Sequence, residues 1–271
     1  MRINLENEFI KVEFESFGAE IKSVVKKATG QEYMWSADPA YWGKTAPFLF
    51  PFIGKLVQEE YTYEGKVYPA DKHGFGQRVD YKVVTQEADR IVFRTTDSPE
   101  TYDKYPFHFV LDIEYVLGED SVAENWYVKN TGDNTMYFSI GSHEGYATPE
   151  GIEDYDVIFP EKETLSARLL NGNLLGDQYV PVLKDSNVLP LYDKYFTVDA
   201  LVFTTLQSRS ATLRNRKTGK AIRVDFPGKD YFLLWHKPDW RKLLPRASPE
   251  QPLIWPVTVI TNVLLFVSSS L

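Results

Sequence analysis

Residues 108–140, HFVLDIEYVLGEDSVAENWYVKNTGDNTMYFSI, decide the fold class. Apolar and polar residues alternate within this stretch, which is the period of a β-strand with one buried face. Turn-forming residues interrupt the alternation at Gly118 and at residues 130–134. The stretch therefore predicts three consecutive strands joined by short turns, at His108–Tyr115, Ala123–Val128 and Met136–Ile140.

The same pattern recurs along most of the chain. Further strands are predicted near residues 10–14 and at Tyr61–Tyr68, Tyr81–Val84, Arg90–Arg94, Asp156–Phe159, Ala200–Phe203, Ala211–Arg214, Ala221–Phe226 and Tyr231–Trp235. The helical candidates, Asp38–Trp42 and Leu191–Phe196, are each about one or two turns long. Many short strands with almost no helix predict a mostly β protein, a large antiparallel β-sandwich or barrel. No linker or repeat interrupts residues 1–271, so we expect one domain.

The C-terminal segment, residues 240–271, is atypical. Glu250 is the last charged residue, and QPLIWPVTVITNVLLFVSSSL follows it without any charge. Its prolines and polar residues argue against a membrane span. We expect a buried terminal strand pair here, and an altered reading frame is the alternative.

Composition excludes several classes of function. The net charge of −8, without a cluster of Lys or Arg, argues against nucleic-acid or anionic-membrane partners. The chain has no cysteine, which excludes disulfides, thiolate nucleophiles and Cys-ligated zinc and fits a cytoplasmic location. The first residues, MRINLENEFIKVEF, are charged and polar where a signal peptide needs an apolar run, and they read as a strand.

Four histidines are the candidates for proton transfer near neutral pH. His143 follows the strand predicted at 136–140 and has a glycine on each side within two residues, so a ligand could approach closely. His73 lies in a second glycine-rich loop, DKHGFGQR. His108 alternates with apolar neighbours and should face the opposite side of its strand, towards solvent or a second sheet. His236 ends a strand and could line a cleft.

Other kinds of site lack their sequence signatures. Neither HxH nor HExxH occurs, which argues against a metal site, and no glycine-rich nucleotide motif is present. Ser142 is not in a GxSxG motif. A carboxylate acting with a histidine remains, and this pair suits proton transfer between two oxygens.

Several segments together resemble the aldose 1-epimerase superfamily, in its galactose-mutarotase-related branch. They are APFLFPFIGKL, YTYEGKVYPADKHGFG, YPFHFVLDIEY, NTGDNTMYFSIGSHEGYATP, LYDKYFTVDALVF and DYFLLWHKP, in the family's order. The resemblance implies a large antiparallel β supersandwich that interconverts the α and β anomers of a free aldose. It implies a glutamate base at the anomeric hydroxyl, a histidine acid at the ring oxygen, and no cofactor.

The resemblance also assigns roles to single residues. His143 matches the family's catalytic acid, and His73 matches the sugar-binding histidine of the HGF motif. Asp199 in DALVF matches the substrate-binding aspartate, and Lys55 stands where the family often has an arginine. Arg78 corresponds to the arginine that often follows the HGF motif, where it would bind a sugar or a phosphate.

The chain departs from the family pattern at three places. His143 is followed by Glu144 where the family often has proline. Arg78 lies one position further from the HGF motif than the family's arginine. If this segment is a strand, its neighbouring residues face opposite sides, and the Arg78 side chain would then point away from the site. The family's base lies in a Glu-Pro-Trp motif, whereas here HKPDWRKLLPRASPEQPLIW follows the Leu-Trp pair. Glu250 is the predicted base, and Asp239 is a weaker substitute.

Three functions remain open. The first is a mutarotase acting on a hexose or a hexose phosphate, as a monomer or a homodimer. The second is a sugar-binding protein that keeps His73, His143 and Asp199 but lacks a competent base. The third is a carbohydrate hydrolase or lyase, which would need two carboxylates flanking the scissile bond, and the sequence shows no such paired motif.

Overall fold

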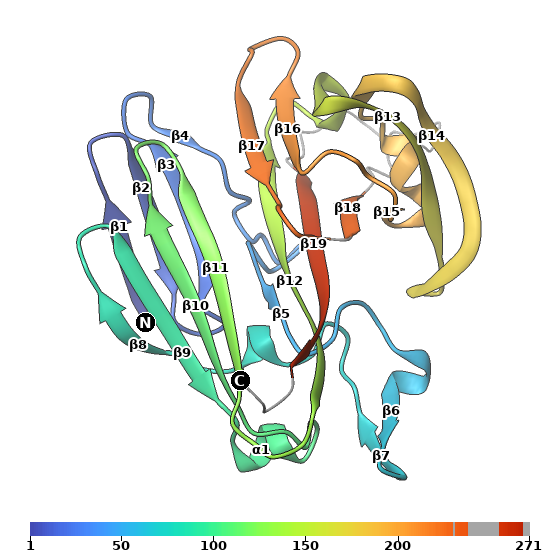
Figure 1. Ribbon diagram of the computed structural model, residues 1–271. Helices are drawn as coiled ribbons and strands as arrows, with labels where there is room; N and C mark the ends of the chain where they lie inside the picture. Colours follow the sequence, from blue (N-terminus) through green and yellow to red (C-terminus); the bar gives the residue numbers. More distant parts are fainter. Residues whose placement is uncertain (230, 238–254, 268–271) are drawn as a thin grey trace. The chain divides into compact units, whose positions relative to one another are not determined.

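Strands dominate the computed structural model, which describes residues 1–229, 231–237 and 255–267 (Figure 1). The strands are β1 (Arg2–Glu6), β2 (Ile10–Glu15), β3 (Glu20–Lys26), β4 (Gln31–Glu32), β5 (Phe48–Leu49), β6 (Glu60–Tyr63), β7 (Lys66–Pro69), β8 (Lys82–Gln86), β9 (Arg90–Thr96), β10 (Phe109–Leu117), β11 (Val122–Asn130), β12 (Met136–Thr148), β13 (Tyr155–Asn171), β14 (Leu174–Pro190), β15 (Leu201–Phe203), β16 (Ser210–Asn215), β17 (Ala221–Asp225), β18 (Tyr231–His236) and β19 (Trp255–Val267). The helices are α1 (Pro99–Tyr102) and the 3-10 turns η1 (Val57–Glu59), η2 (Gly76–Arg78), η3 (Ile152–Asp154) and η4 (Asp193–Val198). The predicted mostly β class is confirmed.

The chain divides into two compact units. The first contains Met1–Met34, Thr45–Ser142 and the described residues from Leu264 on. The second contains Trp35–Lys44 and the described residues of His143–Val263. Strand β12 therefore begins in the first unit and ends in the second. Whether the two units together form the single domain predicted over residues 1–271 stays a prediction.

The first unit is an antiparallel β-sandwich. Its two four-stranded sheets have the orders β1-β2-β3-β4 and β11-β10-β9-β8. Their facing sides are apolar: the ring of Phe14 in β2 lies 4.7 Å from that of Tyr115 in β10 and 6.0 Å from that of Phe93 in β9. The Tyr115 hydroxyl also donates a hydrogen bond to the Ala19 carbonyl at 2.8 Å, which ties the two sheets together.

The stretch at residues 108–140 forms the three strands expected of it. Strands β10 and β11 pair along their whole length, from Phe109 opposite Asn130 to Leu117 opposite Val122. The third strand, β12, is longer than predicted and pairs at Gly141 with β5. The alternation identified these strands correctly because more buried and more exposed side chains alternate along them.

The second unit is built on one antiparallel sheet with the order β17-β16-β13-β15-β18-β19, and β14 pairs with β13. The rings of Phe159 and Phe226 lie 6.0 and 4.9 Å from Phe232, which lies in its core. Gly172 and Asn173 connect β13 to β14 with positive φ angles of 59° and 70°. Such angles are those of a tight hairpin turn, and β14, which follows it, is a strand that the sequence prediction missed.

Two other expectations need correction. Asp38–Trp42 is a hydrogen-bonded turn, in which the N–H of Trp42 donates to the Asp38 carbonyl at 2.9 Å, and it is not a helix. At the C-terminus we expected a pair of strands, and the described residues contain one strand there, β19. It runs antiparallel to β18, from Asn262 opposite Tyr231 to Val257 opposite His236. The second helical prediction holds as η4, which begins two residues later than expected.

The helices of the described residues are all too short or too polar to cross a membrane.

Candidate functional site

In the first unit, two loops hold His73 from both sides. The His73 N–H donates to the Gly54 carbonyl at 2.9 Å, and the Gly54 N–H donates to His73 Nδ1 at 3.1 Å. Gly74 has a φ of 65°, and a Cβ there would overlap the Phe50 carbonyl oxygen, so only glycine fits. His73 itself has a φ of 65°, which is uncommon for a residue with a side chain and typical of functional sites.

This environment keeps the His73 ring neutral. Burial, followed by the charges of Lys72 and Arg78, lowers the pKa of His73 from 6.5 to about 4. Because Nδ1 accepts a hydrogen bond, the single ring proton of the neutral form is on Nε2. His73 is thus suited to donating a hydrogen bond to a sugar oxygen, and unsuited to exchanging protons near neutral pH.

The basic candidates of the first unit lie beside His73. Lys55 follows Gly54 and forms an ion pair of 2.9 Å with Glu59. Arg78 donates to the Gly74 carbonyl at 3.2 Å and lies 3.5 Å from an Asp71 oxygen. Residues 76–78 form η2, so the argument that strand neighbours face opposite sides does not apply to Arg78. The structure brings Lys55, His73 and Arg78 onto one pair of loops.

In the second unit, His143 lies within β12, because that strand continues to Thr148. It does not follow the end of a strand, as the sequence had suggested. Its side chain is buried, with 9% of the residue exposed. The imidazole ring lies 4.9 Å from the indole ring of Trp42, with 30° between their planes.

Trp42 is held in place by the segment Trp35–Lys44. The Trp35 N–H donates to the Gly145 carbonyl of β12, and Trp35 Nε1–H donates to the Trp42 carbonyl, both at 2.8 Å. The Trp42 ring also lies 6.1 Å from that of Trp235 in β18. The sequence prediction missed Trp42 and Trp235, which form an aromatic group beside His143.

Asp199 follows η4 directly. Its backbone has φ 78° and ψ −117°, and its N–H donates to the Phe196 carbonyl at 3.1 Å. A non-glycine residue keeps such a conformation only where its surroundings impose it. Asp199 thus shares the second unit with His143.

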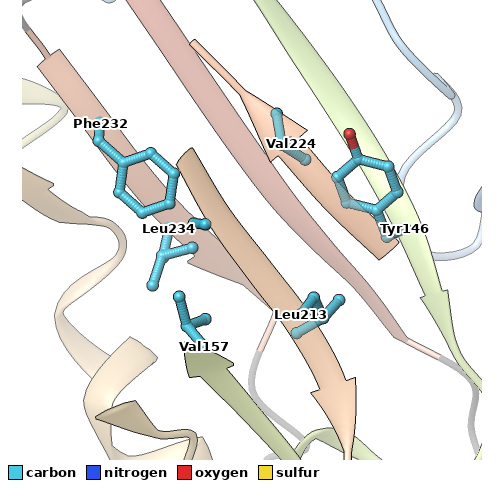
Figure 2. Close-up of a pocket in the computed structure, with 7 residues that line it drawn as sticks. Tyr146, Val157, Leu213, Val224, Phe232 and Leu234 are labelled. Atoms are coloured by element: carbon cyan, nitrogen blue, oxygen red, sulfur yellow. The ribbon is translucent and has the colours of Figure 1, made fainter. Parts of the chain in front are cut away.

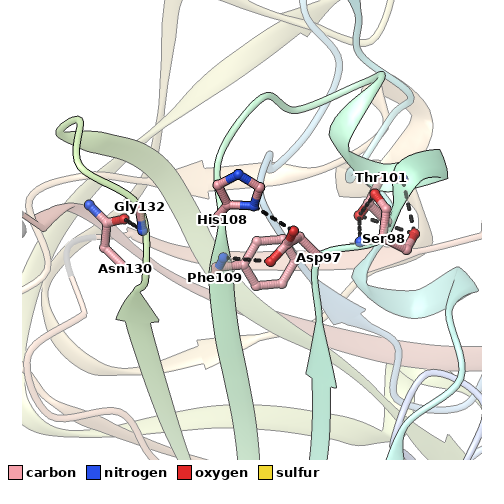
Figure 3. Close-up of polar contacts among 7 residues, drawn as sticks. All are labelled: Asp97, Ser98, Thr101, His108, Phe109, Asn130 and Gly132. Atoms are coloured by element: carbon pink, nitrogen blue, oxygen red, sulfur yellow. Dashed lines mark hydrogen bonds and ion pairs between the residues drawn. The ribbon is translucent and has the colours of Figure 1, made fainter.

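The other two histidines have different surroundings. His108 precedes β10 with 55% of its side chain exposed, and Asp97 lies 2.7 Å from its Nδ1 (Figure 3). The expectation that His108 faces away from the core is confirmed. His236 is fully buried, 3.0 Å from Asp193, so it does not line an open cleft.

An apolar cavity in the second unit is not a sugar site. With about 10 Å³ open to the centre of a water molecule, it has room for about one water at most. Figure 2 shows aliphatic and aromatic side chains around it. The lining residues are Tyr146, Val157, Ala211, Leu213, Val224, Phe232 and Leu234. A sugar needs more room and more polar partners.

Two further candidates, Glu250 and Asp239, lie outside the described residues. Within the described part of the chain, no group of three His, Cys, Asp or Glu is arranged to hold a metal ion.

The comparison with protein families identifies the chain. The family described as Aldose 1-epimerase matches residues 1–249. The chain belongs to the aldose 1-epimerase family. The match ends one residue before Glu250, close to where the chain departs from the family's pattern.

Individual relatives agree with this assignment. The plasmid and chromosomal LacX proteins of Lactococcus lactis subsp. lactis are each 33% identical over 248 residues, which cover 87% of this chain and 83% of theirs. The X-ray structure of a galactose mutarotase related enzyme from Lactobacillus acidophilus is 31% identical, with a TM-score of 0.83 over 97% of this chain and 85% of that one.

A galactose mutarotase-like protein from Lactobacillus casei is 24% identical, with a TM-score of 0.84 over 99% of this chain and 96% of that one. Together these similarities confirm the expected mutarotase-like β fold of the family.

Proposed function

We propose that the protein is a mutarotase that interconverts the α and β anomers of a free hexose such as galactose or glucose, or of a hexose phosphate. His143 donates a proton to the ring oxygen while Glu250 removes the proton of the anomeric hydroxyl. The bond between the ring oxygen and the anomeric carbon breaks, and an open-chain aldehyde forms. Rotation of the aldehyde and closure on its other face return both protons.

The position of His143 carries this proposal. Its imidazole is buried in β12 and lies against the Trp42 indole. Aromatic faces favour the apolar C–H surfaces of a sugar ring, and a buried histidine beside such a face can act on the bound sugar. Family membership supports the reaction class.

The surroundings of the other histidines support the same choice. His73 is neutral, with its pKa near 4, so it is proposed to bind a sugar hydroxyl and not to shuttle protons. His108 lies on the surface beside Asp97, and His236 is enclosed with Asp193. Asp199 and Lys55 are proposed to bind sugar hydroxyls, and Arg78 a hydroxyl or a phosphate.

The test is polarimetry of freshly dissolved α-galactose and α-glucose with the purified protein. His143→Asn should lower turnover by roughly two to four orders of magnitude, the usual contribution of one acid–base group. His108→Asn makes the same change at an exposed histidine and should leave turnover near that of the wild type. Wild-type turnover in His143→Asn would overturn the assignment of the acid.

A sugar-binding protein without turnover is the second candidate, because the family match stops at residue 249. Glu250→Gln separates the two functions. Loss of turnover in this variant with retained galactose binding supports Glu250 as the base. A wild type that binds galactose in calorimetry but leaves its mutarotation rate unchanged would establish the binding protein instead.

A further inference from the structure

A buried hydrogen bond joins helix η4 to the end of strand β18. Asp193, the first residue of η4, and His236, the last residue of β18, have side chains only 4% and 0% exposed. The His236 Nε2–H donates to Asp193 Oδ1 at 3.0 Å. The His236 ring also meets the edge of Phe196, in the middle of η4, with 5.5 Å between ring centres.

The chain returns to β18 soon after η4. Strands β15 and β18 are antiparallel, with Leu201 opposite Leu234. Asp199 and Ala200 connect η4 to β15 and precede its paired positions. His236 thus contacts Asp193 at the start of η4 and Phe196, whose carbonyl accepts the Asp199 N–H.

The backbone of Asp199 needs such a support. Its φ of 78° is costly for a residue with a side chain, and the adjoining helix, η4, is only six residues long. One hydrogen bond within this turn, from the Asp199 N–H to the Phe196 carbonyl, holds the residue locally. The hydrogen bond from His236 to Asp193, at the other end of η4, fixes the orientation of the whole helix.

We propose that His236 and Asp193 are positioning residues that set the orientation of Asp199 towards the sugar. This inference rests on the proposed function, in which Asp199 binds a sugar hydroxyl. A buried polar pair contributes little net stability compared with well-packed apolar residues, but it restricts geometry. The pair thus acts on sugar affinity through Asp199, without touching the sugar.

The positioning role of His236 is distinct from the role of the neighbouring Trp235, which belongs to the aromatic group beside His143. Residues of a strand alternate between its two faces. Trp235 lies 6.1 Å from Trp42, on the face that carries the proposed sugar site, whereas His236 points to the opposite, buried face beside Phe196. A change at His236 therefore reaches the sugar through η4 and Asp199.

The test is a double-mutant cycle on the full-length protein, with KM and kcat for galactose as the readouts. His236→Leu should raise KM about tenfold or more, the effect of misplacing one hydrogen bond to a charged group, with a smaller change in kcat. His236→Gln keeps an N–H donor for Asp193 and should restore most of the affinity. In the Asp199→Ala background, His236→Leu should have no further effect on KM.

A second variant guards against loss of folding. Replacing both members of the pair, Asp193→Leu with His236→Leu, leaves no unpaired buried charge and should keep the chain folded. Circular dichroism and the unfolding temperature verify each variant. A folded double variant with wild-type KM would overturn the inference, as would additive effects of His236→Leu and Asp199→Ala.

The outcomes distinguish this inference from the proposed function. A wild type that neither accelerates mutarotation nor binds galactose overturns both. A wild type that binds without turnover is assayed by the same cycle, with the Kd for galactose in place of KM. An active or binding wild type with an additive cycle overturns the positioning role alone.

Discussion

Lowering the pH should destabilise the protein through His73. Its pKa is about 4 in the folded chain and 6.5 when unperturbed. Because the unfolded chain binds a proton first, the free energy of unfolding is fully retained above pH 6.5 and declines as the pH falls towards 4. The shift of about 2.5 pKa units corresponds to about 3 kcal/mol in total. About 2 kcal/mol of this should be lost between pH 7.5 and pH 5.

His73→Asn isolates this contribution. Asparagine tolerates the φ of 65° better than most residues, and its Oδ1 can accept the Gly54 N–H in place of Nδ1, but it does not titrate. Urea unfolding followed by tryptophan fluorescence gives the free energy of unfolding of both proteins at each pH. The wild-type value minus the variant value should fall by about 2 kcal/mol from pH 7.5 to pH 5. A difference that stays constant within about 0.5 kcal/mol would refute a neutral, shielded His73.

Three further substitutions test the supporting structure. Gly74→Ala places a Cβ against the Phe50 carbonyl oxygen at a residue with positive φ. It should lower the free energy of unfolding by about 2 kcal/mol or more. An unchanged unfolding temperature would contradict the close approach of the two segments. Glu163→Leu removes the buried acceptor of the Ser208 N–H and hydroxyl, both at 2.7 Å. In urea unfolding it should lower the free energy of unfolding by about 3 kcal/mol. An unchanged free energy of unfolding would contradict the structural role of Glu163. His108→Gln should change the free energy of unfolding by less than about 1 kcal/mol, because the pair with Asp97 is exposed, and a loss of turnover would contradict its placement on the surface.

The strands that the sequence predicted well are those with one buried face. In β10, alternate residues from Phe109 to Ile113 are buried, so the hydrophobic period is visible in the sequence. Strand β14 was missed because most of its side chains are exposed and its pairing with β13 is interrupted by register shifts. Because β14 has no buried face and an irregular register, its sequence shows no alternation of apolar and polar residues.

The candidate site divides in the same way. His73 and His143 were found because glycines and sequence motifs mark them. Trp42 and Trp235 carry no such mark, because an isolated tryptophan in a strand-rich chain is usually part of the core. The pairing of His236 with a residue 43 positions away depends on how η4 packs against the end of β18, which the sequence does not contain.

Turnover requires a base as well as an acid, and four buried carboxylates of the described residues are poor candidates for it. Glu20, Glu114, Glu163 and Asp193 are buried, and each already accepts hydrogen bonds from backbone groups or from Arg or His side chains. The hydrogen bond from Arg90 lowers the pKa of the Glu114 carboxyl, which makes it a weaker base. Glu250 remains the predicted base. Because glutamine keeps the volume of glutamate without its basicity, Glu250→Gln should abolish turnover while leaving sugar affinity intact.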